Sequence, residues 1–391
     1  METRRAMGRA LRASIARDNV AERFAAAVSS ARSEDLSGIA DEAERHGVPG
    51  YVARADKMTG GLLPPEVAED VADAGRAALF AHLVALAELE QIAAAFARAG
   101  IRWLIVKGPV LAEMLHGRPE LRSYRDVDLL VDPAHLDAAL QALGENDGDV
   151  LDRNWTLLLR EMKGELHVEM PAGTMIDLHW DLFNERSRRD RHSVPFDRLH
   201  ARSVEMAVGR TKVRTLDPLD TLVYVALHTM ASGADRLVWI KDLDLAATAA
   251  QPWAGDLPER IEEWGAELIV PCALSRVDAA LGPHERSLPT GGERLGDRTW
   301  MWICRAAWKA SPVEQQHGDA SLGRLVARSV RPDAASSLRA LAHKSRRAAK
   351  GGPRSLDERR LGAAHPSSGF YPSGGEAARR AFLQAVGQGG T

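Results

Sequence analysis

The sequence predicts an α+β fold, in which a small mixed sheet with flanking helices is embedded between N-terminal and C-terminal helical regions. Two observations lead to this prediction. Residues 1–100 and 217–350 are rich in helix-forming residues with apolar positions three and four apart, and short β-branched runs lie between them. We therefore expect an N-terminal helical region at 1–98, a core at 99–208, a C-terminal helical domain at 209–350 and a flexible tail at 351–391.

The composition is typical of a soluble globular protein. Of 391 residues, 45% are apolar and 27% are charged, and the formal net charge is -3, which indicates neither a disordered chain nor a globally nucleic-acid-binding one. Only two cysteines occur, without a zinc-ligand spacing, and this favours a reducing compartment. Since no signal peptide and no run of eighteen apolar residues is found, we expect a cytoplasmic protein without a membrane span.

The expected elements follow in chain order. They are a helix at 66–99 that stops before Gly100, a strand at 101–106, a helix at 110–115, a strand at 124–131 and a helix at 133–143. Two runs with alternating apolar residues, 165–170 and 175–180, are separated by the turn sequence PAGT and predict a β-hairpin. Helices resume at Asp217-Pro218, and the tail contains one short expected helix at 376–386.

Three carboxylates form the candidate site. Asp126 and Asp128 are two apart on a predicted strand, so both side chains point to the same face. Asp177 lies on the polar face of the second hairpin arm, and we expect an antiparallel neighbour to bring it beside the pair. Carboxylates this close repel one another, and a divalent cation between them relieves the repulsion. The expected cofactors are two Mg²⁺ ions and a nucleoside triphosphate donor, with all three aspartates as metal ligands and catalytic residues.

A single Asp-x-Asp pair is more often a solvated turn or the end of a strand. Here the context favours a site, because an apolar strand continues from the pair and a Lys-Gly turn precedes it. In that turn, Gly108 would let backbone amides approach a phosphate, and Lys107 would add a positive charge. The same Lys-Gly-Pro sequence is also an ordinary connection from strand to helix. Arg122 either steadies phosphates or lies on the surface.

Four segments in this order, WLIVKGPVLAEML, ELRSYRDVDLLV, IDLHWDL and LVYVALHTMASGADRLVWIKDLDLAA, resemble the uncharacterised nucleotidyltransferase family of the DNA-polymerase-β-like superfamily. Its members share a Lys-Gly turn, an Arg-x-x-x-Asp-hydrophobic-Asp strand and a later Asp-hydrophobic-His-Trp strand. The resemblance covers residues 75–250 and implies a nucleotidyltransferase core. The matching positions are Lys107, Gly108, Arg122, Asp126, Asp128, Asp177 and His179, with His228 and Asp242 downstream.

One position departs from the wider superfamily. Its glycine turn usually continues with Gly or Ser, which offers an amide or a hydroxyl to phosphate, whereas Pro109 has no N–H. Further substrate-binding candidates lie in the helical part of the chain. His228 is either functional or a satisfied histidine among apolar residues, and Arg236 and Lys241 either reach the triphosphate or are solvated charges.

The resemblance and the carboxylates together predict an enzyme. We expect a Mg-dependent nucleotidyltransferase that moves a nucleoside monophosphate from an NTP, by default ATP, to a hydroxyl or phosphate of an unidentified acceptor. The resemblance favours a small molecule or a peptide as the acceptor, because members of the family resemble accessory enzymes of peptide and natural-product pathways. Nucleic acid is the lesser alternative, because the basic residues between Arg324 and Arg354 lack interleaved aromatic residues. The alternative is an inactive binding module that keeps this fold and recognises a peptide, a protein or RNA.

Overall fold

The structure is a computed structural model, and it describes residues 2–283, 288, 295–309, 311–316, 322–349 and 365–389. Contacts divide the chain into two compact units. The sheet unit comprises Leu83–Val110, Arg125–Asp217 and Arg347–Thr391, and the helical unit comprises Met1–His82, Leu111–Tyr124 and Pro218–Arg346. Each unit is assembled from separate segments of the sequence. The four continuous domain ranges expected from the sequence stay a prediction.

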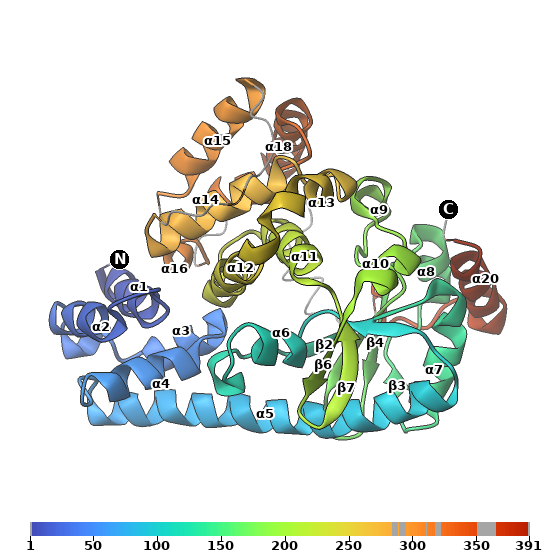
Figure 1. The fold of residues 1–391 in the computed structure, drawn as a ribbon, viewed down its shortest axis with the longest axis horizontal. Helices are drawn as coiled ribbons and strands as arrows, with labels where there is room; N and C mark the ends of the chain where they lie inside the picture. Colours follow the sequence, from blue (N-terminus) through green and yellow to red (C-terminus); the bar gives the residue numbers. More distant parts are fainter. Residues whose placement is uncertain are drawn as a thin grey trace. The chain divides into compact units, whose positions relative to one another are not determined.

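A five-stranded mixed sheet forms the centre of the sheet unit (Figure 1). Its strands lie in the order β1 (Trp103–Ile105), β2 (Asp126–Val131), β5 (Met175–His179), β4 (Glu165–Glu169) and β3 (Asp149–Val150). β2 and β5 are parallel, and the other neighbours are antiparallel. The small mixed sheet with its flanking helices confirms the predicted fold class.

The pairing of β2 with β5 corrects one expectation from the sequence. An antiparallel neighbour was expected to bring Asp177 beside the first aspartates, but β5 runs parallel to β2. The predicted hairpin itself is confirmed, because β4 and β5 pair antiparallel. Helix α7 (Leu136–Gly144), β3 and helix α8 (Trp155–Glu161) connect β2 to this hairpin, and such a long connection lets β5 return in the direction of β2.

Side chains alternate between two faces along the three central strands. One face is apolar and buried, and it comprises Val127, Leu129, Leu166, Val168, Ile176 and Leu178. The other face is polar, and it comprises Asp126, Asp128, Glu165, His167, Asp177 and His179. Burial of each large aliphatic side chain contributes roughly 1.5–3 kcal/mol to the free energy of unfolding. The packed apolar face therefore fixes the strands whose other face carries the polar side chains.

A buried glutamate fixes the turn of the β4–β5 hairpin. Helix α5 (Pro65–Arg98) continues from the helical unit into the sheet unit after His82. Its Glu88 is buried and accepts hydrogen bonds from the backbone N–H groups of Ala172 at 2.7 Å and Thr174 at 3.2 Å. Gly173 in this turn has a φ of +92°, a conformation that favours glycine. The turn geometry in turn sets the register of the two strands.

The remaining elements of the sheet unit are α6 (Pro109–Met114), which begins in it, η3 (Pro133–His135), α9 (Arg186–His192), α10 (Phe196–Arg202), β6 (Val204–Val208), β7 (Thr211–Thr215) and α20 (Gly375–Gly387). Helix α20 confirms the short helix predicted in the tail. It packs against α8, and a β-bridge joins Asn154 to Ser373 just before it (Figure 1). Residues 351–364 of the predicted tail lie outside the described residues.

The helical unit contains the helices predicted on both sides of the core. They are α1 (Glu2–Ser14), α2 (Val20–Ser29), η1 (Ser33–Asp35), α3 (Ile39–His46), α4 (Pro49–Met58), η2 (Pro119–Leu121), α11 (Pro218–Ser232), α12 (Leu237–Ala249), η4 (Gln251–Asp256), α13 (Leu257–Glu263), α14 (Ile269–Leu281), α15 (Leu295–Ala307), α16 (Pro312–Gln316), α17 (Leu322–Ala327) and α18 (Ala334–Ala349). The start of α11 at Pro218 confirms the predicted Asp-Pro start signal.

Helix α5 is the one helix, within the described ranges, that is long and apolar enough by composition to cross a membrane. A core helix of a soluble protein meets the same criterion. Two polar side chains of α5 are buried against protein. His82 Nδ1 lies 2.9 Å from the Tyr124 hydroxyl in the helical unit, and Glu88 binds the hairpin turn in the sheet unit.

Candidate active site

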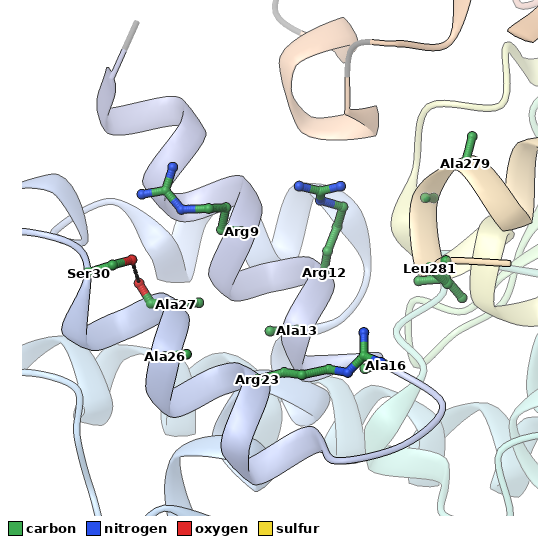
Figure 2. A pocket seen from close by; sticks show the side chains of 12 residues that line it. Arg9, Arg12, Ala13, Ala16, Arg23, Ala26, Ala27, Ser30, Ala279 and Leu281 are labelled. Carbon is green, nitrogen blue, oxygen red and sulfur yellow. Dashed lines mark hydrogen bonds between the residues drawn. The ribbon is translucent and has the colours of Figure 1, made fainter.

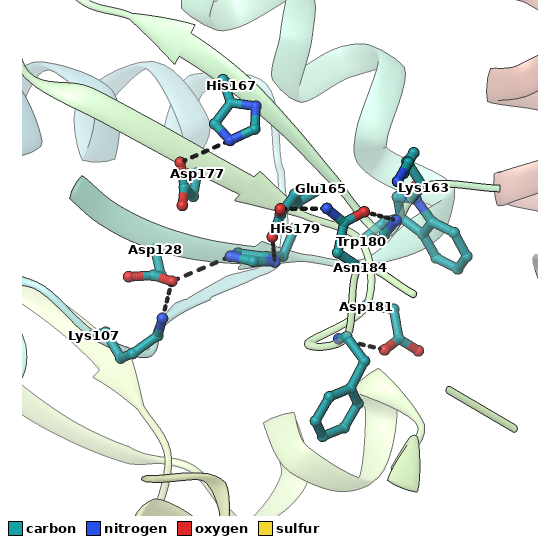
Figure 3. A network of polar contacts seen from close by, with 12 residues as sticks. Lys107, Asp128, Lys163, Glu165, His167, Asp177, His179, Trp180, Asp181 and Asn184 are labelled. Carbon is teal, nitrogen blue, oxygen red and sulfur yellow. Dashed lines mark hydrogen bonds and ion pairs between the residues drawn. The ribbon is translucent and has the colours of Figure 1, made fainter. Parts of the chain in front are cut away.

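The candidate site lies on the polar face of β2, β5 and β4. The strand register places Asp128 opposite Asp177, and Asp177 opposite His167. Ligand atoms of Asp128, Asp177 and His179 all lie within 4.8 Å of one another. Asp126 shares the face at the start of β2. The three predicted aspartates and His179 therefore belong to one surface of the sheet, as Figure 3 shows for all but Asp126.

Asp128 is the most buried of the three aspartates, with 1% of its surface exposed. Its Oδ1 lies 2.5 Å from Lys107 Nζ and 3.3 Å from His179 Nε2 (Figure 3). Burial would raise the pKa of Asp128, but Lys107 and His179 outweigh burial and hold that pKa well below its usual value. Its Oδ2 is buried and has no hydrogen-bond partner among the described residues. Such an oxygen is costly unless a cation binds it.

The pKa of Asp177 is shifted in the opposite direction from that of Asp128. Burial, followed by repulsion from Asp128 and Asp126, raises the pKa of Asp177 to about 7. The neighbouring histidines, His179 and His167, oppose this rise without cancelling it. One carboxylate of the facing pair is therefore firmly ionised, and the other is only partly ionised at neutral pH unless additional positive charge lies nearby. A divalent cation would supply that charge.

His179 lies between two acids on the same face. Its Nε2 is 3.3 Å from Asp128 Oδ1, and its Nδ1 is 3.6 Å from Glu165 Oε2. Burial lowers the pKa of His179, but the hydrogen bond to Asp128 and the charge of Glu165 outweigh burial and raise it above its usual value. His179 and Lys107 thus both contact Asp128 Oδ1 and together orient the carboxylate.

Sequence reasoning missed a second histidine of the polar face. His167 Nε2 lies 3.7 Å from Asp177 Oδ1, and His167 Nδ1 lies 2.7 Å from Asp152 Oδ2. The hydrogen bond to Asp152, stronger than the opposing effect of burial, raises the pKa of His167 to about 9. The sequence signal for His167 is the alternation of β4, which places it on the same face as Glu165. Counting from the PAGT turn alone would pair Asp177 with Val168, but Met170 also belongs to the loop, and the observed register pairs Asp177 with His167. Asp152 lies in a connection whose path no local pattern predicts.

The Lys-Gly-Pro turn packs tightly against β2. Gly108 has a φ of +70°, and a Cβ at this position would lie 2.8 Å from the carbonyl oxygen of Asp126 and 3.2 Å from the Cα of Val127. Glycine is therefore required by the approach of the turn to the site strand, a reason that is separate from the expected approach of a phosphate. Pro109 begins the short helix α6, and Lys107 pairs with Asp128.

Arg122 belongs to the helical unit, where it is buried. Its Nε and Nη2 donate to the two oxygens of Asp242 at 2.8 and 2.9 Å. His116 Nε2 lies 2.7 Å from Asp242 Oδ1, and the Tyr51 hydroxyl lies 2.8 Å from His116 Nδ1. Burial would raise the pKa of Asp242, but Arg122 and His116 outweigh burial and lower it. Within this unit Arg122 stabilises a polar core, and its substrate-binding role stays a prediction.

The other predicted substrate-binding residues also lie in the helical unit. His228 on α11 packs edge-on against Trp239, with ring centroids 5.6 Å apart. Arg236 Nε donates to the Arg45 carbonyl at 2.9 Å, and its guanidinium lies over the Trp239 ring. Lys241 is buried and lies 3.3 Å from Asp244, and burial lowers its pKa. Their roles toward a nucleotide stay predictions.

A cavity of about 570 Å³ lies in the helical unit between α1, α2 and α14 (Figure 2). Arg9, Arg12 and Arg23 line it together with small residues, mostly alanines. Burial lowers the pKa of Arg12 despite the opposing charge of Glu314. This cavity can attract an anion. None of the described residues that line it is an acid or a histidine, whereas the sheet face brings such residues together.

Comparison with known proteins adds one finding. A family model described as "Uncharacterised nucleotidyltransferase" matches residues 32–282, which is more than half of the chain. The matched range includes every residue of the candidate site discussed above from Lys107 to Lys241. No curated protein and no solved structure matches the chain.

Proposed function

The chain belongs to the uncharacterised nucleotidyltransferase family, and from this premise we propose that it moves a nucleoside monophosphate from an NTP, by default ATP, to an acceptor. An acceptor hydroxyl or phosphate oxygen attacks the α-phosphorus, the bond from that phosphorus to the bridging oxygen breaks, and pyrophosphate leaves with the displaced electron pair. The proton of an attacking hydroxyl passes to a base, for which we propose Asp177. The main support is the facing pair Asp128 and Asp177, whose oxygens converge with His179 within 4.8 Å.

The donor set of the sheet face fits divalent cations. Asp128 offers a buried oxygen without a hydrogen-bond partner among the described residues, and nearby positive charge would favour full ionisation of Asp177 at neutral pH. We propose Asp126, Asp128 and Asp177 as the ligands of two ions, with Mg²⁺ as the default because it prefers hard oxygen ligands. When bound, such ions neutralise the triphosphate and lower the pKa of the acceptor hydroxyl.

The residues around the aspartates orient and neutralise them. Lys107 and His179 hold Asp128 Oδ1 in one position, which presents Oδ2 in a fixed direction. Lys107 also places a positive charge 2.5 Å from Asp128, and this charge offsets the repulsion between the carboxylates and an approaching triphosphate. Gly108 lets the turn that carries Lys107 lie against β2.

The acceptor is proposed to be a small molecule or a peptide, and the protein is proposed to act in the cytoplasm. Cys272 and Cys304 are free and buried, with their sulfurs 3.8 Å apart. Free thiols at this distance are compatible with a reducing compartment.

The binding experiment is a calorimetric titration of the full chain with ATP, with and without Mg²⁺. We expect Mg²⁺-dependent binding that the Asp126→Asn, Asp128→Asn double variant loses. The matched control is Asp149→Asn, which removes an exposed carboxylate from β3 of the same sheet and should bind as the wild type does. Unchanged Mg²⁺-dependent affinity in the double variant would contradict the site.

The chemical experiment uses Asp177→Ala. This variant should keep much of the NTP affinity, which depends mainly on the ion held by Asp126 and Asp128, but lose turnover by several orders of magnitude. The measurement is pyrophosphate release in the presence of candidate acceptors. Release at the wild-type rate would reduce Asp177 to a structural residue of β5.

A binding module is the second candidate function, and two observations favour it. Pro109 offers no N–H to a phosphate, and Lys107 already neutralises Asp128. A module of this kind would bind its partner equally well after substitution of Asp177. Wild-type protein that binds no NTP in the presence of either Mg²⁺ or Mn²⁺ would favour this candidate over the transferase.

A further inference from the structure

Three strands present a continuous row of possible ligands across the sheet. The row runs from Asp128 on β2 through Asp177 on β5 to His167 on β4, in register and on one face. Asp177 Oδ1 lies 3.7 Å from His167 Nε2. Donor atoms that are each about 2.1 Å from one ion are roughly 3 to 3.5 Å apart, so a small adjustment lets a single ion bind both atoms.

Asp152 holds His167 in an orientation that suits a metal ligand. Asp152 Oδ2 lies 2.7 Å from His167 Nδ1 and also accepts a hydrogen bond from the backbone N–H of His167 at 2.7 Å. Asp152 is itself buried. When Nδ1–H donates to this carboxylate, Nε2 is left to face Asp177. Metal-binding histidines in proteins are commonly oriented in this way by a carboxylate on the other ring nitrogen.

The ring of His167 is supported from a second side. Phe370 packs edge-on against it, with centroids 5.9 Å apart and an interplanar angle of 86°. The backbone N–H groups of Arg153 and Asn154, next to Asp152, donate to the Gly369 carbonyl at 3.0 and 2.8 Å. The segment around Gly369 therefore fixes both members of the Asp152–His167 pair, while a third of the His167 side chain stays exposed.

We propose that His167 is a ligand of the ion held by Asp177, that Asp152 orients it, and that this position selects a first-row transition ion such as Mn²⁺ over Mg²⁺. The inference rests on the metal site of the proposed function and alters the identity of one of its two ions. Mg²⁺ prefers oxygen ligands and retains its waters, whereas an imidazole nitrogen adds affinity for transition ions. A metal ion binds the imidazole only when Nε2 carries no proton.

The two ions would be chemically unequal. Asp128, Asp177 and His179 form one group of converging atoms, and His167 contacts that group through Asp177. Asp177 would help to hold both ions. The ion near Asp128 would be held mainly by carboxylates, and the ion near His167 would have an imidazole ligand in addition.

The test measures metal binding by the full chain without nucleotide. Calorimetric titrations with MnCl₂ and MgCl₂ should show tighter binding of Mn²⁺ by the wild type. His167→Ala and Asp152→Asn should each weaken Mn²⁺ binding by about 10–100-fold and change Mg²⁺ binding much less. Glu169→Gln is the matched control, since Glu169 lies on β4 on the same face but is exposed. It should change Mn²⁺ affinity by less than about threefold.

Pulsed electron paramagnetic resonance identifies the ligand directly. Bound Mn²⁺ should show nitrogen coupling that His167→Ala loses. His179→Ala is the comparison, and retention of the coupling in His167→Ala with loss in His179→Ala would overturn the inference. His167→Gln provides a second variant of similar size, and circular dichroism shows whether each variant is folded.

Failure of this inference is distinguishable from failure of the proposed function. If Asp128→Asn loses metal binding while His167→Ala and Asp152→Asn retain wild-type affinity and selectivity, the inference is wrong and the proposed carboxylate site stands. If Mn²⁺ binds through His167 but no NTP binds, the inference stands and the transferase proposal is wrong. Equal wild-type affinities for Mn²⁺ and Mg²⁺ would also overturn the proposed selectivity.

Discussion

At the scale of single residues, identical side chains acquire opposite properties from their neighbours. Asp128 and Asp177 face each other in register, yet Lys107 stabilises the charge of Asp128 while the pKa of Asp177 rises to about 7. The sequence predicted that the aspartates would repel one another, and the raised pKa agrees with that argument. The sequence could not predict which aspartate would have the raised pKa, because the contact between Lys107 and Asp128 depends on how the Lys-Gly-Pro turn packs.

Asp177→Asn should stabilise the metal-free protein at alkaline pH. Because the pKa of Asp177 is raised in the folded state, the folded protein loses stability as the pH rises from about 4, the value in the unfolded chain, through about 7. The variant lacks this loss. In the presence of a chelator, its free energy of unfolding should exceed that of the wild type by up to about 4 kcal/mol at pH 8, and the two should be equal near pH 4. Urea unfolding at both pH values is the measurement. A comparison with Asp128→Asn should show destabilisation at pH 8, because the pKa of Asp128 is lowered.

Gly108→Ala should destabilise the sheet unit and weaken metal binding. The new Cβ would meet the Asp126 carbonyl at 2.8 Å and force the turn away from β2. Gly100→Ala is the control, because Gly100 has a similar φ of +66° but no atom within 4 Å of an added Cβ. The positive φ alone costs roughly 1–2 kcal/mol, and crowding at Gly108 should add about 1–3 kcal/mol to that cost. Equal unfolding free energies of the two variants would contradict the argument from close packing.

At the scale of elements, local patterns predicted the hairpin but not its place in the sheet. The alternation on both sides of PAGT defined β4 and β5, but the turn sequence alone would pair Asp177 with Val168, whereas the structure pairs Asp177 with His167 because Met170 belongs to the loop. The parallel pairing of β5 with β2 could not be predicted from local patterns, because it depends on the path of α7, β3 and α8. Local patterns also do not predict the contact of Glu88 with the turn, because the two are 84 residues apart in the sequence.

Glu88→Ala should loosen the hairpin that carries Asp177. The substitution leaves the N–H groups of Ala172 and Thr174 without their acceptor in a buried place and should cost about 1–3 kcal/mol. Glu90→Ala, on the exposed side of the same helix, removes a surface pair with Arg210 and should cost less than about 1 kcal/mol. Hydrogen exchange of the two turn amides locates the effect. Unchanged protection of these amides in Glu88→Ala would show that the glutamate does not hold the turn.

At the scale of the whole molecule, composition predicted helical parts on both sides of a small sheet but not their interleaving. Segments before, within and after the predicted core contribute to each unit. Periodicity reports the local environment of a helix and contains no information on which distant segments share its core. For the same reason, the sequence did not predict the ion pair of Arg122 with Asp242, which lies 120 residues away in the chain.

Arg122→Ala should strongly destabilise the helical unit, because it leaves the buried Asp242 carboxylate without its bidentate partner. The expected cost is about 3–5 kcal/mol near neutral pH. The pKa of Asp242 is lowered in the folded state, so its contribution is present above about pH 4 and is lost as the pH falls further. Arg118→Ala is the control, since Arg118 forms an exposed pair with Glu120. Chemical denaturation of both variants between pH 3 and pH 7 tests the prediction, and equal losses would contradict it.

The docking of residues 365–389 beside Asp152 has a consequence for biosynthesis. A ribosome makes β1 to β7 well before it reaches Gly369, Phe370 and Ser373, which contact the loop that holds Asp152 and its neighbours. A nascent chain that already contains all five strands of the sheet therefore still lacks the support of the His167 ring. The last segment of the helical unit, Pro218–Arg346, is translated in the interval. The support of the His167 ring by Phe370 therefore forms only after synthesis has passed residues on both sides of that segment.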